Sequence, residues 1–294
     1  MKKILLVVLL LTGCGLGCVL AQVTLQVVSK NIEKTVPWKQ GMELIVNGEK
    51  ADITVVSTDS EIISVSAELS AKHPSLDTAQ IDVGTWQFVV NTIGKRIYLR
   101  TYVGVQAGKR APASNMRAHI QISIPRRCPI NLSNKFGKAK LEHLDAPITL
   151  NGYFCRFDLY ALSGKLQIES EHGPIEGREL NGTVDIKGKR ADVTLYNPAG
   201  DCVLMTEYGT VNLYTDQQSG NVRITGQMTN ITLNGLDTIA HNYRLKTHFG
   251  NMDVPQTFDR RGGADKDFQA SYQATPNSPT IDVETTLGHI KVEH

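Results

Sequence analysis

Three carboxylates and one arginine in the second half of the chain are the residues whose types could support polysaccharide chemistry. Cleavage of a sugar polymer needs acidic groups, or basic groups beside a metal, that converge on one face. The candidates are Asp158, Glu176, Asp185 and Arg223. They fall at different phases of the repeat described below, so the sequence does not predict a shared face. We therefore expect no catalytic residue, and a β-helix lyase or hydrolase remains the alternative function.

Other catalytic and metal-binding signatures are absent from the sequence. It contains no GxSxG, HExxH or GxxxxGK[ST] motif and no CxxC pair. The calcium-binding GGxGxD repeat is also absent, and its nearest approach is a single GGAD at residues 262–265. The histidines show no metal-ligand spacing; they stand at positions 73, 119, 143, 172, 241, 248, 289 and 294. We expect neither a metal nor a cofactor.

The first 21 residues predict a targeting segment. Two lysines precede an apolar stretch, which ends in a VLA cleavage signal at residues 19–21. Residues 11–14 (LTGC) also match a lipobox, which would make Cys14 the lipidated first residue of the mature chain. Residues 15–21 are still apolar, whereas a lipid tether is usually polar, so simple cleavage is favoured. Both interpretations predict an extracytoplasmic protein.

The charge of the mature chain limits its partners. Removing Lys2 and Lys3 takes the formal charge from +2 to about zero. A neutral chain argues against nucleic acid and against electrostatic docking on anionic lipid. No later segment is long and apolar enough to span a bilayer as a helix. We expect contact with a membrane only through an N-terminal lipid.

Three cysteines remain after the targeting segment: Cys128, Cys155 and Cys202. An odd, sparse set is not a disulfide framework, and at most one bridge can form. The favoured interpretation is three partly buried free thiols, and whether two of them form a disulfide stays open.

Residues 22–130 predict a small β-rich domain resembling a sandwich. Residues 43–47 and 51–57 flank a Gly-Glu-Lys turn and predict a hairpin. Residues 86–91 and 96–102 flank a second turn, which contains Gly94. Between these hairpins, residues 75–83 predict a short helix capped by Ser75, with Leu76, Ala79 and Val83 on its apolar face.

From residue 131 to 294 an apolar-x-apolar unit recurs every nine residues. The regular series is Ala139/Leu141, Ile148/Leu150, Phe157/Leu159, Leu166/Ile168, Ile175/Gly177, Val184/Ile186 and Val193/Leu195. It continues with small slips and resumes at Ile281/Val283 and Ile290/Val292, giving fifteen pairs. Two inward side chains around one outward residue make a short strand, and stacked units bury a continuous apolar column. This pattern predicts an all-β single-stranded β-solenoid (β-helix).

Glycines mark the corners of this repeat and group its units into fours. Gly137, Gly173, Gly209, Gly250 and Gly288 each follow an aromatic, histidine or leucine residue. Tight corners often need a positive φ, which glycine adopts readily, and examples are Gly164, Gly182 and Gly220. The grouping favours 18 or 36 residues per coil. A 36-residue coil would place Lys140 beside Glu176 and Asp253 beside Lys291.

Residues 255–279 interrupt the repeat and predict an insertion loop, because they are polar and rich in glycine and proline. Outside the predicted core, several polar and aromatic residues could meet a glycan or a protein, or could be ordinary strand exteriors. They are Tyr196, Asn197, Thr210, Asn212, Tyr214 and Thr215.

The corner segments SGKLQI, YGTVNL, SGNVRI and LGHIKV resemble the bacterial putative adhesin family of exported β-solenoid repeat proteins. The segments GEKADITVVS, VSAELSAKHP and GKRIYLRTY, with the VLA junction before Gln22, are similar to its Bacteroidetes-type branch. The resemblance covers most of the mature chain, and the insertion at 255–279 departs from it. With the repeat, the export signal and the missing catalytic motifs, we expect a non-catalytic, surface-associated binding or scaffolding protein in the cell envelope. The sequence does not name its partner, and a cell-surface glycan or protein is the candidate.

Overall fold

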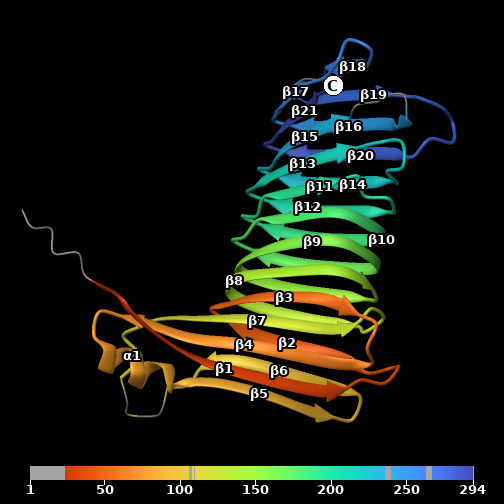
Figure 1. Ribbon diagram of the computed structural model, residues 1–294. Coiled ribbons are helices and arrows are strands. Elements are labelled where there is room, and N and C mark those ends of the chain that lie inside the picture. The colour runs from red at the N-terminus through yellow and green to blue at the C-terminus, as the bar shows by residue number, and fades with distance from the viewer. Residues whose placement is uncertain (1–23, 106–107, 109, 236–239, 263–266, 294) are drawn as a thin grey trace, which may run out of the picture.

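The computed structural model describes residues 24–105, 108, 110–235, 240–262 and 267–293, and these residues form twenty-one strands and one helix. The strands stack into a tall body, with the N-terminal strands at one end and the C-terminal strands at the other (Figure 1). The strand pairs follow two rows, which we call row A and row B. We call one circuit of the chain through both rows a coil. The protein is all-β, as the sequence predicts.

Row A contains strands from every part of the chain. In spatial order they are β5 (Trp86–Ile93), β6 (Arg96–Val103), β2 (Glu43–Glu49), parts of β8 (Ile130–Asp145), β9 (Ile148–Glu171) and β10 (Ile175–Lys189), then β12 (Cys202–Glu207), β14 (Val222–Gln227), β20 (Thr280–Thr286), β16 (Asn242–His248), β19 (Phe268–Tyr272) and β18 (Asp259–Gly262).

Row B runs beside row A. In spatial order it contains β1 (Gln26–Pro37), β4 (Ile62–His73), β7 (Asn115–Pro125), β3 (Ala51–Thr58), the other parts of β8, β9 and β10, then β11 (Val193–Tyr196), β13 (Thr210–Thr215), β15 (Asn230–Gly235), β21 (His289–Glu293) and β17 (Asn251–Asp253).

The register fixes the length of a coil. Ile130 pairs in parallel with Ile148, and Phe157 pairs with Ile175 in the other row, so each coil takes 18 residues and two nine-residue units. One later coil takes 20 residues, because Cys202 pairs with Val222 in row A and Val211 pairs with Ile231 in row B. A 36-residue coil is therefore wrong.

The 18-residue coil changes which charged residues lie side by side on the outside of the stack. Lys140 lies beside Asp158 and not beside Glu176, because Asp158 occupies the intervening coil. Asp253 does lie beside Lys291, as predicted.

Most apolar pairs of the repeat belong to one continuous buried cluster that extends from Trp38 to Val292. The predicted pair Val203/Met205 is wrong, because Met205 is 51% exposed and the inward residues of that unit are Cys202 and Leu204. Leu159 is 3% exposed and Val193 is fully buried. Burying one such side chain stabilises the fold by about 1.5–3 kcal/mol. The alternation of inward apolar and outward polar residues thus places the core between the two rows.

The N-terminal strands join the same two rows. β2 and β3 do not pair with each other, so the hairpin predicted for residues 43–57 is wrong. β2 pairs with β6 and β8, and β3 pairs with β7 and β8. Lys50, with a φ of 51°, forms a corner between the rows. Because the sheets run without a break across residue 130, the proposed boundary between 22–130 and 131–294 stays a prediction.

Two local predictions in this region are confirmed. β5 and β6 form an antiparallel hairpin. Helix α1 (Leu76–Val83) is capped by the Ser75 side chain, which accepts a hydrogen bond from the Thr78 backbone N–H. The helix lies at the N-terminal end of the body, against β1 and β4 (Figure 1). Its predicted apolar face is only partly right, because Leu76 is exposed while Ala79 is buried.

At the C-terminal end, the last coil in sequence is not the last in space. β20 lies between β14 and β16, and β21 lies between β15 and β17. The predicted insertion loop contains two strands, β18 and β19, and β19 pairs antiparallel with β16. The segment also buries Phe258 against Tyr243 and Tyr272, with ring centroids 5.4 Å apart in the first pair. The insertion therefore covers the row A end of the core.

Candidate binding groove

A long groove runs along the outer face of row A, across seven consecutive coils. Its volume is ≈ 980 Å³. Three consecutive positions of each coil line it: residues 133–135, 151–153, 169–171, 187–189, 205–207 and 225–227, together with Thr286. These positions match because the parallel register places residue 169 beside 187, and 187 beside 205. The groove is thus a direct product of the coil register.

The middle residue of each set is small and forms the floor. The six are Asn134, Gly152, Ser170, Gly188, Thr206 and Gly226. At Gly152 a Cβ would lie 2.5 Å from the Phe157 ring, so a larger residue would displace a core side chain. Small floor residues keep the backbone close to the core. The residues on either side point outward and form two walls.

The walls carry three acidic and three basic side chains. They are Lys135, Glu169, Glu171, Lys187, Lys189 and Glu207. Lys187 Nζ donates to Glu169 Oε1 at 3.1 Å. That hydrogen bond and the charge of Glu169 raise the pKa of Lys187. Charged side chains line the groove in four of its seven coils, and their formal charges cancel.

A ridge of large residues borders the groove at the next position of each coil. It contains Phe136, Phe154, His172, Arg190, Tyr208, Met228, Leu287 and Phe249, and all eight have φ between 49° and 59°. The aromatic and aliphatic members are 45–59% exposed. Phe154 stacks on Phe136 and on His172, with ring centroids 5.7 and 4.5 Å apart. Tyr153 of the groove wall meets the same rings edge-on.

The ridge conformation is costly for these residues. A left-handed backbone costs an L-residue roughly 1–2 kcal/mol, and only glycine, asparagine or aspartate adopts it readily. Bulky side chains at eight such positions are therefore not explained by local preference. Their exposure shows that core burial does not explain them either. Ridge residues of neighbouring coils do contact one another: Phe154 stacks on Phe136 and His172, and Arg190 lies over the Tyr208 ring at 5.8 Å.

The glycines after the ridge residues have another role than the predicted one. Gly137, Gly173, Gly209, Gly250 and Gly288 lie at the corners, but the positive φ belongs to the residue before each. A Cβ on Gly173 would lie 2.0 Å from the carbonyl oxygen of Cys155 in the preceding coil. These five glycines are required by close backbone contact between coils. Gly164 and Gly182 have the positive φ predicted for them, whereas Gly220 does not.

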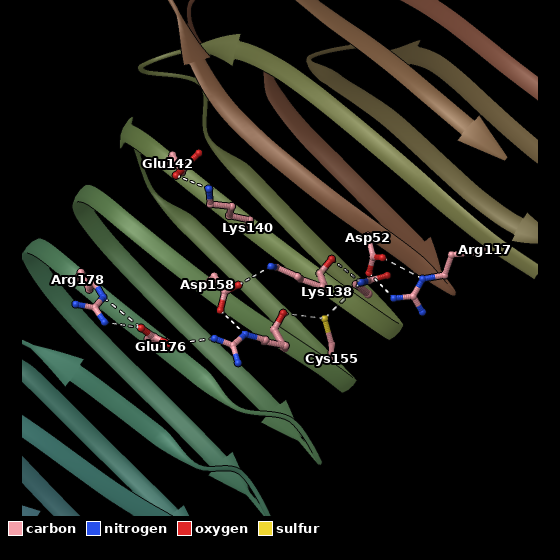
Figure 2. A network of polar contacts seen from close by, with 11 residues as sticks. Asp52, Arg117, Lys138, Lys140, Glu142, Cys155, Asp158, Glu176 and Arg178 are labelled. Carbon is pink, nitrogen blue, oxygen red and sulfur yellow. Dashed lines mark hydrogen bonds and ion pairs between the residues drawn. The ribbon is translucent and has the colours of Figure 1, made fainter. Parts of the chain in front are cut away.

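A ladder of ion pairs crosses the coils on the outer face of row B (Figure 2). Asp158 binds Lys138 at 2.9 Å and Arg156 at 2.5 Å, and Arg156 also reaches Glu176 at 2.9 Å. Arg178 binds the other oxygen of Glu176 at 2.8 Å. These hydrogen bonds raise the pKa of Arg156. Both oxygens of each carboxylate are thus engaged by cations.

The four residues considered for polysaccharide cleavage form two separate sets. Asp158 and Glu176 are neighbours on row B. Asp185 and Arg223 lie on row A in one column, separated by Val203, and Arg223 approaches Asp282 at 3.8 Å. The two sets do not converge on one face, as expected from their phases.

The residues considered for binding lie on or near row B, away from the groove. Tyr196 and Tyr214 stack with ring centroids 4.6 Å apart, and Arg178 lies over the Tyr196 ring at 3.8 Å. The two tyrosines therefore extend the ion-pair ladder.

The other predicted binding residues are mostly occupied by local structure. Asn197 is a corner residue with a φ of 48°, and Thr215 is buried. Thr210 donates from its hydroxyl to Asp192 at 2.7 Å, and Asn212 lies between Thr194 and Thr232. Sequence reasoning thus missed the groove. One sequence feature could have predicted the groove: a small residue follows each apolar pair of row A, mostly at 18-residue spacing.

The three cysteines are free and buried. Burial raises the pKa of Cys128 to about 12, of Cys155 to about 11 and of Cys202 to about 12. Their thiols stay protonated near neutral pH and behave as small apolar side chains.

Some predicted features lie outside the described residues. They are the targeting segment, Cys14, His294 and most of the GGAD stretch. Within the described ranges, no cluster of three or more His, Cys, Asp or Glu residues is placed to hold a metal ion. The single described helix is too short to cross a membrane.

No family model and no curated protein matches this sequence. Solved structures do resemble it. One described as a putative adhesin from Parabacteroides merdae is 9% identical, covers 92% of this chain and 97% of its own, and has a TM-score of 0.44. A second, described as a putative adhesin from Bacteroides fragilis, is 11% identical over 90% of this chain and 97% of its own, with a TM-score of 0.41.

A third similar structure carries a different description. The protein from Parabacteroides distasonis is described as a putative lipid binding protein. It is 10% identical over 90% of this chain and 97% of its own, with a TM-score of 0.38. All three descriptions name adhesion or binding, and none names an enzyme.

Proposed function

We propose that this chain is an exported, non-catalytic, surface-associated protein that binds or scaffolds an extended ligand, and that the row A groove is its binding site. The observation that carries the proposal is the continuity of the groove across seven coils. Ligand sites are concave, combine apolar and aromatic surface with a few placed polar groups, and reach about 1,000 Å³. The groove has this volume, with Tyr153 and the ridge along one side.

The same proposal includes the architecture and the location. We infer that the stacked coils form a β-solenoid with two nine-residue units per coil, preceded by a β-rich N-terminal domain at 22–130. The 18-residue register and the single buried cluster support this. We propose that residues 1–21 direct export, with Cys14 as the alternative lipidation site. A binding protein of the cell surface requires export.

The enzymatic alternative rests on one observation, the adjacency of Asp158 and Glu176. Each of these carboxylates is held by two cations, which leaves neither oxygen free to exchange a proton with a substrate. The ladder is better explained as a stabilising surface network.

The test measures binding and turnover on the same samples. The protein, expressed with its leader and purified after processing, is applied to arrays of surface glycans and proteins and to whole cells. We expect retention without turnover, and loss of retention in the groove variant Tyr153→Ala. Tyr160→Ala, which removes a half-buried tyrosine from row B, is the control and should bind as wild type. Depolymerisation of a polysaccharide, or retention unaffected by Tyr153→Ala, would contradict the proposal.

A further inference from the structure

The spacing of the groove suits a polymer with one unit per coil. Strands of neighbouring coils lie about 4.8 Å apart, so seven coils extend over roughly 29 Å. One extended sugar residue is about as long as one coil is high. An extended peptide rises about 3.3 Å per residue and loses this register within a few coils.

The direction of the groove also disfavours a peptide strand. Peptides commonly bind by adding a strand to a free sheet edge. The groove runs across the strands, and its coils are already paired on both sides, for example at Lys187, which lies between Glu169 and Met205. It therefore offers no free edge along its length.

The charge pattern disfavours a polyanion. Glu169 and Glu171 occupy one coil, and Lys187 and Lys189 occupy the next. Glu207 follows in the coil after that. An anionic chain long enough to reach the lysines would meet carboxylates on both sides. Uncharged hydroxyls can donate to the glutamates and accept from the lysines, so they suit the acidic coils and the basic coils alike.

The aromatic end of the groove supplies flat apolar surface. Tyr153 is 39% exposed, and its ring meets Phe136 and Phe154 edge-on with centroids 5.7 and 4.8 Å away. These contacts hold the ring in place beside the groove. Sugar rings present apolar C–H faces between their hydroxyls, and a fixed aromatic ring can pack against such a face.

A lipid surface fits less well. His172 and Arg190 interrupt the exposed apolar residues of the ridge. Six ionisable groups line the groove beside it, and an apolar phase would have to desolvate them.

We infer that the ligand of the groove is an uncharged polysaccharide, lying along the stack with about one sugar per coil and its apolar faces on Tyr153 and the neighbouring ridge. This inference rests on the proposed function and names the ligand class for it.

Isothermal titration calorimetry tests the inference with uncharged oligosaccharides of increasing length. Cello-, xylo- and manno-oligosaccharides provide the series, and the protein is processed from its full precursor. We expect affinity in at least one series to rise up to about six or seven sugars and then stay level. Tyr153→Ala should weaken binding of the longest member at least tenfold, whereas Tyr160→Ala should leave it unchanged. Thermal melting of both variants checks that each is folded.

Three competitors separate the inference from the proposed function: polygalacturonate, extended peptides and vesicles of anionic phospholipid. Tighter binding of any of these, lost in Tyr153→Ala, would overturn the uncharged-polysaccharide inference and leave the groove as a binding site. Binding by no class of ligand, or binding that Tyr153→Ala does not change, would overturn both. Affinity that is independent of chain length would overturn the one-sugar-per-coil arrangement.

Discussion

The outer faces of row A and row B are built from the same 18-residue register but differ in how their charged side chains are paired. On row B, both oxygens of Asp158 and Glu176 are bound by cations of the same or adjacent coils. On row A, Lys135, Lys189 and Glu207 have no ion-pair partner among the described residues. The register alone therefore does not make a binding face. Small residues on the floor, and three wall charges without an ion-pair partner among the described residues, distinguish the groove from the ladder.

The largest expected effect is on the core that both faces share. Leu159→Asp and Val193→Asp each place an unpaired charge among buried apolar residues, and each should cost about 4 kcal/mol or more. Circular dichroism melting should show loss of the stack, with the groove lost even though both positions are on row B. Thr194→Asp, one residue along on the outer side, is the control. Wild-type melting of both core variants would show that the inward assignment is wrong.

The next largest effect concerns contact between coils at the ridge corner. Gly173→Ala would place a Cβ 2.0 Å from the Cys155 carbonyl oxygen, so the coils must separate locally. We expect destabilisation of about 1–3 kcal/mol in chemical denaturation. Gly262→Ala is the matched control, because a Cβ there meets nothing within 4 Å. Equal stability of the two variants would show that close packing at Gly173 is not required.

A smaller effect is expected from the ladder. Glu176→Gln removes the anion shared by Arg156 and Arg178, but the pairs are largely solvent-exposed. We expect a loss of about 0–1 kcal/mol, which should shrink further at high salt. Lys189→Gln in the groove should have no measurable effect on stability. A loss of several kcal/mol for Glu176→Gln would mean that the ladder, and not only the core, holds row B together.

The smallest effect is expected from thiol chemistry. Burial raises the pKa of Cys155 to about 11 and of Cys202 to about 12, so the reactive thiolate is scarce below those values in the folded chain. Iodoacetamide at pH 8 should leave both thiols unmodified in mass spectrometry and should label them after denaturation. Cys155 lies in row B and Cys202 in row A, so the experiment compares how well each row shields its buried thiol from the reagent. Rapid native labelling of one cysteine alone would show that its row is open.

Local patterns made several elements predictable. The cap at Ser75 defines α1, and the turn containing Gly94 joins β5 to β6, because both depend on residues only a few positions apart. The nine-residue alternation likewise predicted most of the inward side chains. It failed by one residue at Val203/Met205, where Cys202 and Leu204 are buried instead. The hairpin at residues 43–57 failed although its strands were placed well. Its turn is a corner between rows, and strand pattern alone does not choose a pairing partner.

The sequence by itself determined the nine-residue repeat, most of the inward residues and the capped helix, since each follows from short-range periodicity or local hydrogen bonding. Only the tertiary structure decided which strands pair. Leu44 pairs with Ile130, and Val222 pairs with Ile281, so β2 and β20 each lie between coils that are distant in sequence. Closing a longer loop costs little more than closing a shorter one, so the best-packed partner prevails over the nearest one. The groove exists only once that register aligns its three positions across seven coils.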